Sequence, residues 1–245
     1  MYAKRAGKSA NGRKTSGGYG SDAAVHPESL SPGCKSLLSL LAGLSKKYDF
    51  VLAGGTALAL HLGHRMSYDL DFFTNHPFDA DRLLAGMDRK GVKYRILQRG
   101  KGTLLLTSGD VKFSFFRVPS PLIEDTTEYG GAEVADILDI AAMKVLAIYQ
   151  RGKKRDYVDL FFILKDIPFR KVCDNFVGKY GASKVNPVDI GKSLVYFADA
   201  EIDPEPVYLG DGRPTWAEVK KFHVANVKQM VYDMENAVNE QGEKD

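Results

Sequence analysis

A chain of 245 residues suits one large domain or two small ones, and its 44% apolar and 11% aromatic residues exclude wholesale disorder. The net charge is +3, and residues 1–30 carry that whole excess, so the neutral remainder supplies no compositional argument for nucleic-acid binding. No apolar run reaches the ~18 residues of a membrane span, and Cys34 and Cys173 form no Cys-x-x-Cys pair, which predicts a cytoplasmic protein with no membrane partner.

The first segment, residues 1–33, contains few large apolar side chains and is expected to be a disordered basic tail. Its basic residues are Lys4, Arg5, Lys8, Arg13 and Lys14. The segment has no hydrophobic h-region, so it does not have the pattern of a secretory signal. The folded part is therefore expected to start at residue 34.

Residues 34–130 are predicted to form an α/β core. Apolar spacing predicts helices over 34–47, 56–62 and 78–90, and strands over 50–53, 69–73, 92–98, 103–107 and 111–118. Glycine-containing turns separate the last three strands, as is typical of hairpins. Pro119 and Pro121 are expected to close this half of the chain.

Residues 131–245 are predicted to be helical. The expected helices are 136–150, 155–165, 168–180, 187–197 and 215–238. Acidic residues in the first turn of the 136–150 segment and Gly152 after it are typical of helix ends. We expect this helical region to complete a site formed by the α/β half.

A glycine-rich turn follows the strand expected over 50–53. Gly54, Gly55 and Thr56 stand where that strand would end and the next helix begin. The first backbone N–H groups of a helix have no partner within the helix, so they can bind a phosphate. The alternative is an ordinary tight turn.

Two carboxylates, Asp69 and Asp71, lie one residue apart on the next predicted strand. Alternate strand residues share a face, which places the two side chains roughly 6–7 Å apart. Carboxylate oxygens are ligands that Mg²⁺ or Mn²⁺ accepts. A structural ion-pair cluster with Arg65 or Lys144 is the alternative, because burying unpaired carboxylates is costly.

Two other kinds of enzyme also use an Asp-x-Asp motif. Haloacid-dehalogenase-type phosphatases place Thr or Val where this chain has Phe73, so that interpretation fails. Metal-dependent glycosyltransferases use Asp-x-Asp to bind a sugar-nucleotide diphosphate. The short lead-in and the Gly-Gly-Thr turn count against that fold without excluding it.

A second group of charged residues follows in the helical half. Lys144 and Arg151 lie seven residues apart, nearly two full turns, so on a helix they share one face. Lys and Arg both suit phosphates, the first as a point charge and the second as a bidentate fork. Arg155, Asp156 and Asp159 follow on the next helix, where an ordinary salt-bridged hairpin is the alternative.

Together, residues 52–73 and 144–160 resemble the AbiEii/AbiGii-type nucleotidyltransferases, distant relatives of the DNA polymerase β superfamily, over about residues 35–230. The resemblance implies an α+β fold, with a polymerase-β-like core of mixed sheet and flanking helices plus a helical C-terminal region. It also implies Mg²⁺-dependent use of a nucleoside triphosphate. Membership of a toxin–antitoxin or phage-defence system is implied too, with a cognate antitoxin as partner and RNA or tRNA as acceptor.

Position by position, the resemblance assigns roles to six residues: Gly55 and Thr56 as the glycine–hydroxyl motif, Asp69 and Asp71 as the metal-binding pair, and Lys144 and Asp156 as the later conserved Lys and Asp. One departure matters. Many polymerase-β-like enzymes supply a third carboxylate from a later strand, and Ser114 stands at that position here. Because serine is neither an anionic ligand nor a strong base, a two-metal mechanism is in doubt.

The sequence thus predicts a nucleotidyltransferase that moves a nucleoside monophosphate onto an RNA 3′ end, a protein hydroxyl or a small molecule. Gly54, Gly55 and Thr56 would bind the terminal phosphates. Arg65 and Ser67 would either contact phosphate or brace the loop. The alternative is a non-catalytic nucleotide-binding module that retains the fold and regulates a partner.

Overall fold

One mixed β-sheet forms the centre of the part of the chain that the computed structural model describes, residues 25–243. The strand order is β3-β4-β5-β2-β1-β7-β6. Strand bounds are β1 (Val51–Ala53), β2 (Asp69–Thr74), β3 (Arg95–Gly100), β4 (Thr103–Ser108), β5 (Val111–Arg117), β6 (Thr127–Tyr129) and β7 (Ala132–Val134). The β2–β5 and β1–β7 pairs are parallel, and the other four pairs are antiparallel.

Three helices accompany the sheet: α1 (Pro32–Lys47), α2 (Gly54–Leu62) and α3 (Ala80–Arg89). The Ser31 hydroxyl caps α1 by accepting a hydrogen bond from the backbone N–H of Cys34, and Asp79 caps α3 in the same manner. The leucine stripe of α1 is buried against the sheet, as its helical spacing predicts.

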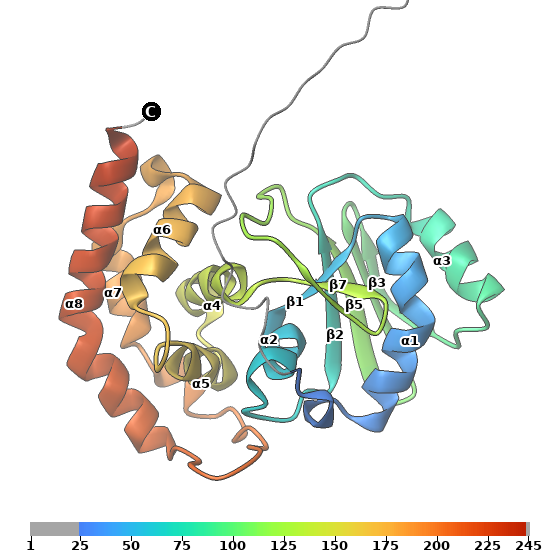
Figure 1. Cartoon of the computed structure of the whole chain (residues 1–245), viewed down its shortest axis with the longest axis horizontal. Helices are drawn as coiled ribbons and strands as arrows, with labels where there is room; N and C mark the ends of the chain where they lie inside the picture. Colours follow the sequence, from blue (N-terminus) through green and yellow to red (C-terminus); the bar gives the residue numbers. More distant parts are fainter. Residues whose placement is uncertain (1–24, 244–245) are drawn as a thin grey trace, which may run out of the picture.

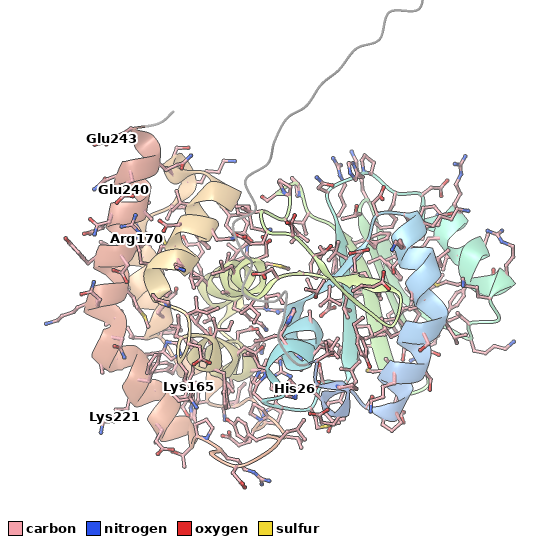
Figure 2. All side chains as sticks on the ribbon, viewed as in Figure 1. His26, Lys165, Arg170, Lys221, Glu240 and Glu243 are labelled. Atoms are coloured by element: carbon pink, nitrogen blue, oxygen red, sulfur yellow. The ribbon has the colours of Figure 1, made fainter. Side chains whose placement is uncertain are left out.

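A second group of helices forms the C-terminal region: α4 (Ile137–Arg151), α5 (Lys154–Ile163), α6 (Phe169–Tyr180), α7 (Pro187–Leu194) and α8 (Trp216–Gly242). Asp136 caps α4, and Gly152 ends it in the left-handed conformation with a φ of +51°. The long helix α8 runs along the outer side of this region (Figure 1). An ion pair between Arg170 and Glu240, 2.6 Å apart, ties α6 to the end of α8 (Figure 2).

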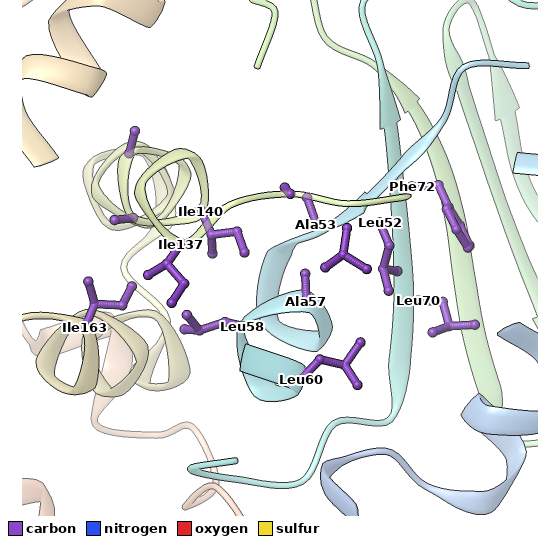
Figure 3. Packing of buried hydrophobic residues seen from close by; sticks show 14 of the residues in the cluster. Leu52, Ala53, Ala57, Leu58, Leu60, Leu70, Phe72, Ile137, Ile140 and Ile163 are labelled. Carbon is purple, nitrogen blue, oxygen red and sulfur yellow. The ribbon is translucent and has the colours of Figure 1, made fainter. Parts of the chain in front are cut away.

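Helix α2 joins the sheet to the helical region. Its buried Ala57, Leu58 and Leu60 lie between strands β1 and β2 on one side and helices α4 and α5 on the other (Figure 3). The apolar core therefore continues from the sheet through α2 into the helical region. This continuity places the start of α2, the start of β2 and the body of α4 around one space.

The expected α+β class is confirmed, and the expected helices and strands are present with shifted ends. The sequence did not predict two strands, β6 and β7, which follow Pro121. The α/β half therefore does not end at Pro119 and Pro121. Strand β7 lies beyond residue 130 and pairs with β1, so the α/β core extends into the region expected to be helical. Each missed strand has three residues, too few for a periodic pattern to show.

The expected disorder of residues 1–33 is wrong for residues 25–33; residues 1–24 lie outside the described part of the chain. Pro27–Ser29 form a 3₁₀ helix, η1, and the side chain of Leu30 is buried in the core with 1% exposure. The backbone N–H of Ser67 donates to the carbonyl of Ser29, which fixes the segment beside β2. The composition of the whole 33-residue segment does not indicate that one of its apolar side chains, Leu30, is buried in the core.

The other short helices are η2 (Ala182–Lys184) and η3 (Ala198–Ala200). Within residues 25–243, no helix has the length and apolar character needed to cross a membrane.

Candidate active site

A cavity of about 570 Å³ lies where the sheet meets the helical region. Its walls come from the start of α2, from β2, from the 118–122 loop, and from α4, α5 and the end of α6. All ten residues selected from the sequence line it: Gly54, Gly55, Thr56, Arg65, Ser67, Asp69, Asp71, Lys144, Arg151 and Asp156. The structure thus brings together residues that lie up to about a hundred positions apart in the chain.

Asp69 and Asp71 occupy alternate positions at the start of β2 and face the cavity, while Leu70 between them faces the core with 0% exposure. Ser114 is the register partner of Asp71 on β5, and its hydroxyl donates a hydrogen bond to Asp71 Oδ1. Burial raises the pKa of Asp71, the hydrogen bond from Ser114 lowers it in part, and the charge of Asp69 raises it again.

These residues fit a divalent cation that arrives with its substrate. No group of three or more His, Cys, Asp or Glu side chains capable of metal binding occurs in the described residues, so the pair stands alone. Mg²⁺ commonly binds through one or two carboxylates and completes its shell with substrate phosphates and water. The Arg155 guanidinium, 3.5 Å from Asp69 Oδ2, partly compensates the negative charge.

The turn into α2 is held close to the carboxylates. Gly54 has a φ of +68°, and a Cβ there would lie 3.4 Å from Asp71 Oδ2. Thr56 Oγ1 lies 2.7 Å from Ser67 Oγ and also donates to the Asp69 carbonyl. The hydroxyl of Thr56 therefore ties α2 to the start of β2.

Asp159, on α5, is the centre of a buried ion-pair network. Arg65 donates to both of its carboxylate oxygens, from Nε at 2.7 Å and from Nη2 at 2.8 Å. His64 Nε2 lies 2.8 Å from Asp159 Oδ1, and burial lowers the pKa of His64, so the neutral ring donates from Nε2. Burial would raise the pKa of Asp159, yet the charges of Arg65 and Lys144 hold it well below its ordinary value.

Lys144 is fixed by two carboxylates at once. Its Nζ lies 2.8 Å from Asp156 Oδ1 and 2.6 Å from Asp159 Oδ2. Asp156 Oδ2 is buried, accepts no hydrogen bond from the described residues, and lies 3.8 Å from Arg151 Nε. Asp156 therefore orients Lys144 with one oxygen, while its other oxygen lies within ion-pair distance of Arg151.

For Arg65 and Ser67 the geometry favours the bracing alternative. Each of the three guanidinium nitrogens of Arg65 donates a hydrogen bond within the protein, because Nη1 also donates to the Met66 carbonyl at 3.0 Å. Ser67 pairs with Thr56, as described above. Both residues shape the loop before β2 and are 6% and 5% exposed.

Sequence reasoning missed the central position of Asp159 and the contribution of His64. A salt-bridged helical hairpin was an equally good interpretation of Asp159; Lys144 of α4 does pair with it, but the pair is buried, because Asp159 is 0% exposed. The available indication was spacing: Asp159 follows Asp156 by one helical turn, so both carboxylates face α4 and Lys144.

Apolar side chains also line the cavity. Met143 and Leu146 of α4, Leu122 of the 118–122 loop and Tyr180 at the end of α6 line it. Lys179 holds this wall together, since its Nζ donates to the Pro121 carbonyl at 2.8 Å and to Asp139 at 2.9 Å. A cavity lined by both charged and apolar side chains suits a ligand that carries phosphates and a flat ring.

Comparison with known proteins yields one family. A family model described as nucleotidyl transferase AbiEii toxin, Type IV TA system, matches residues 37–104 and 106–238. An uncharacterized protein of Aquifex aeolicus (strain VF5) is 41% identical over 189 residues, which covers 74% of this chain and 87% of that protein.

Solved structures show similar folds. JHP933 from Helicobacter pylori superposes with a TM-score of 0.51 at 19% identity, covering 86% of this chain and 97% of that one. MenT4, a nucleotidyltransferase toxin from Mycobacterium tuberculosis, superposes with a TM-score of 0.46 at 20% identity, covering 84% and 91%. The first of these likenesses supports the fold assignment.

Proposed function

This chain belongs to the AbiEii nucleotidyltransferase toxin family, and on that premise we propose that it transfers a nucleoside monophosphate from a nucleoside triphosphate to an acceptor hydroxyl. One observation carries the proposal. The Asp69/Asp71 pair, the turn at Gly54 and Lys144 all line the same cavity, although they come from the sheet and from the helical region. Their shared location supports a site that contacts metal, phosphates and leaving group together.

Each group has a role in the proposed reaction. Asp69 and Asp71 would hold Mg²⁺ or Mn²⁺, which when bound supplies charge stabilisation at the triphosphate. The backbone N–H groups at the start of α2 bind the terminal phosphates. Lys144, fixed by Asp156 and supported by Arg151, offsets the negative charge that grows on the departing pyrophosphate.

The acceptor hydroxyl must lose a proton during transfer. Ser114 stands at the position of a third carboxylate and donates to Asp71, so it cannot accept that proton. We assign this step to Asp156, a residue of the cavity wall whose Oδ2 accepts no hydrogen bond from the described residues. The bond that forms joins the acceptor oxygen to the α-phosphorus, and the bond that breaks releases pyrophosphate.

The proposed partners follow from this chemistry. The substrate is a nucleoside triphosphate, and the acceptor is an RNA or tRNA 3′ end or a protein hydroxyl. The family description names a toxin–antitoxin system, which supports a cognate antitoxin as a further partner. A cytoplasmic place of action agrees with a triphosphate substrate and with two buried free cysteines.

A second candidate function is nucleotide binding without transfer, as a module that regulates a partner. The hydrogen bond from Ser114 to Asp71, in place of a third carboxylate, is the observation that favours it. The presence of Asp69, Asp71 and Lys144 in the cavity favours nucleotidyl transfer over binding alone.

The test mixes the purified chain, Mg²⁺ and each of the four α-labelled nucleoside triphosphates with cellular RNA and with protein extract. We expect one acceptor class to gain label with the wild-type chain and none with Asp69→Ala. Asp81→Ala, which removes an exposed carboxylate on α3, is the matched control and should transfer normally. Nucleotide binding without any transfer would instead support the regulatory module.

A further inference from the structure

A buried ion pair that the proposed reaction does not use joins two helices and a loop at the wall of the active-site cavity. Asp139, in the first turn of α4, and Lys179, near the end of α6, lie 2.9 Å apart, with side chains that are 0% and 2% exposed. We propose that Asp139 and Lys179 are positioning residues, which set the shape of the part of the cavity that receives the nucleobase. This inference rests on the proposed use of a nucleoside triphosphate and adds how its base is held.

The carboxylate of Asp139 fastens the connection between β5 and β6, of which the 118–122 loop is the cavity-lining part. The backbone N–H of Ile123 donates to both carboxylate oxygens, at 3.1 and 3.0 Å. The backbone N–H of Glu124 donates to Asp139 Oδ2 at 2.9 Å. Two successive backbone groups are therefore held by one buried side chain.

Lys179 fastens the same connection at a second place. Its Nζ donates to the carbonyl of Pro121 at 2.8 Å while it pairs with Asp139. Leu122, which lines the cavity, lies between Pro121 and Ile123, and both of these neighbours are hydrogen bonded to the ion pair. The position of Leu122 is thus fixed on either side.

The ion pair also fixes an aromatic ring. Tyr180 follows Lys179 directly as the last residue of α6 and lines the cavity. Its ring packs against that of Phe176, with the two centroids 4.8 Å apart. Helix α6 lies close to the loop, since a Cβ on Gly178 would lie 3.2 Å from Ile123 Cδ1. The ring and the loop are thereby held in one arrangement.

The wall formed by Leu122, Met143 and Tyr180 suits the base of the nucleotide better than its phosphates. Every base has a π-face that aromatic and apolar side chains can contact. Phosphates require cations and N–H groups, which Lys144 and the start of α2 supply elsewhere in the cavity. Movement of this wall should therefore change the affinity for the base and leave the phosphate contacts in place.

The alternative is that the ion pair only stabilises the fold. A buried ion pair is weak evidence for stability, because the cost of removing both charges from water offsets their attraction. Hydrogen bonds, by contrast, fix direction as well as distance. Here they fix two N–H groups and one carbonyl of a segment that borders the cavity, which favours positioning.

The test compares the binding of two probes by calorimetry, each in the presence of Mg²⁺: the four nucleoside triphosphates and inorganic triphosphate, which has no base. Lys179→Met removes the ammonium and keeps an unbranched side chain. It should weaken binding of the preferred nucleotide about tenfold, the size of one lost stacking contact, and leave triphosphate binding unchanged. Lys184→Met, at an exposed position outside the cavity, is the matched control and should bind both probes as the wild type does.

Amide hydrogen exchange gives a second readout, which needs no ligand. The N–H groups of Ile123 and Glu124 should exchange faster in Lys179→Met than in the wild type, because the loop loses one of its tethers. The N–H of Leu70, in the core of β2, should exchange equally in both.

Substitutions of Tyr180 test the wall directly and decide the question where Lys179→Met does not fold. Tyr180→Ala should lower the affinity for the nucleotide and not that for triphosphate. Tyr180→Phe keeps the ring and should bind both probes as the wild type does.

The outcomes separate this inference from the proposed function. Wild-type nucleotide affinity in Lys179→Met or in Tyr180→Ala would overturn the positioning role, and so would equal loss of both probes in a variant that remains folded. Selective loss of nucleotide affinity, with no transfer by the wild type in the labelling assay, would support the positioning role and count against the transferase. A wild-type chain that binds neither probe would overturn both proposals.

Discussion

Asp159 shows how a single buried residue organises the site. Its carboxylate has 0% exposure, yet it remains ionised because Arg65, Lys144 and His64 surround it. The network links the loop before β2 to α4 and α5. Since buried charges are costly without partners, each member depends on the others.

Replacing Asp159 by Asn tests this dependence. The substitution keeps the shape but leaves Arg65 and Lys144 buried with less compensation, so we expect a loss of about 3–5 kcal/mol in the free energy of unfolding. Denaturant unfolding measures it. Asp81→Asn, which removes an exposed partner of Arg99, should cost less than about 1 kcal/mol. Equal, small losses for both variants would contradict the network.

The hydrogen bond from Ser114 to Asp71 leads to a prediction for the pH dependence of Mg²⁺–nucleotide binding at Asp69 and Asp71. Metal binding requires ionised Asp71, whose pKa burial already raises, so affinity for the Mg²⁺–nucleotide complex should fall as pH falls through that raised pKa. The Ser114 hydrogen bond lowers the pKa of Asp71. Ser114→Ala should therefore move the loss of affinity to higher pH.

Titrating Mg²⁺-dependent nucleotide binding from about pH 4 to about pH 8 checks this shift. Ser36→Ala removes an exposed hydroxyl bonded to the Pro32 carbonyl and serves as the control. A profile that moves to lower pH in Ser114→Ala, or does not move, would contradict the assigned role of the hydroxyl.

Among the elements, the turn into α2 leaves no room for a side chain at Gly55. A Cβ on Gly55 would lie 2.5 Å from Arg65 Nη2, which is itself fixed to Asp159. Because Arg65 cannot move without breaking that pair, the turn and the ion-pair network form one unit. A glycine is thus required here by close approach.

Gly55→Ala should displace Arg65 and destabilise the fold by about 1–3 kcal/mol, with a loss of nucleotide affinity. Gly100→Ala, where a Cβ meets no atom within 4 Å, is the matched control. Unfolding and nucleotide-binding measurements on both variants provide the test. Wild-type behaviour of Gly55→Ala in both would show that Arg65 can relocate freely.

Substitution of Leu30 tests whether residues 25–33, which the sequence composition assigned to a disordered tail, stabilise the fold. Because its side chain is buried in the core with 1% exposure, Leu30→Ala should cost about 2–5 kcal/mol in the free energy of unfolding. Leu97, 45% exposed on β3, gives the control Leu97→Ala, which should cost far less. Comparable stability of the two variants would mean that residues 25–33 contribute little to the fold.

The elements differ in how far local sequence predicts them. Strands β1 and β2 and helix α2 were predicted because the features that indicate them, apolar spacing and a double glycine, lie within a few neighbouring residues. Strand β7 was missed because its stability comes from parallel pairing with β1, about eighty residues earlier, and no local pattern encodes such a partner. Leu30 was missed for the same reason, since its partners lie in distant elements.

In the whole molecule, the candidate site lies at the junction of the two halves. The sheet contributes Asp69 and Asp71, and the helical region contributes Lys144 and Asp156. The sequence was sufficient to select these residues, because each is a chemically suitable group in a distinctive local setting. It was not sufficient to decide which cation pairs with which carboxylate, because that depends on the packing of α4 and α5 against α2.

The central claim is nucleotidyl transfer at the Asp69/Asp71 pair, and the position of the label in the nucleotide tests it most directly. Parallel reactions with α-labelled and γ-labelled nucleoside triphosphate are compared for the wild-type chain and Asp71→Asn. We predict that only the α label enters the acceptor and that the γ label leaves in pyrophosphate. Asp71→Asn should abolish both the transfer of the α label and the release of labelled pyrophosphate. Transfer of the γ label to the acceptor, or α-label transfer that survives Asp71→Asn, would contradict the account.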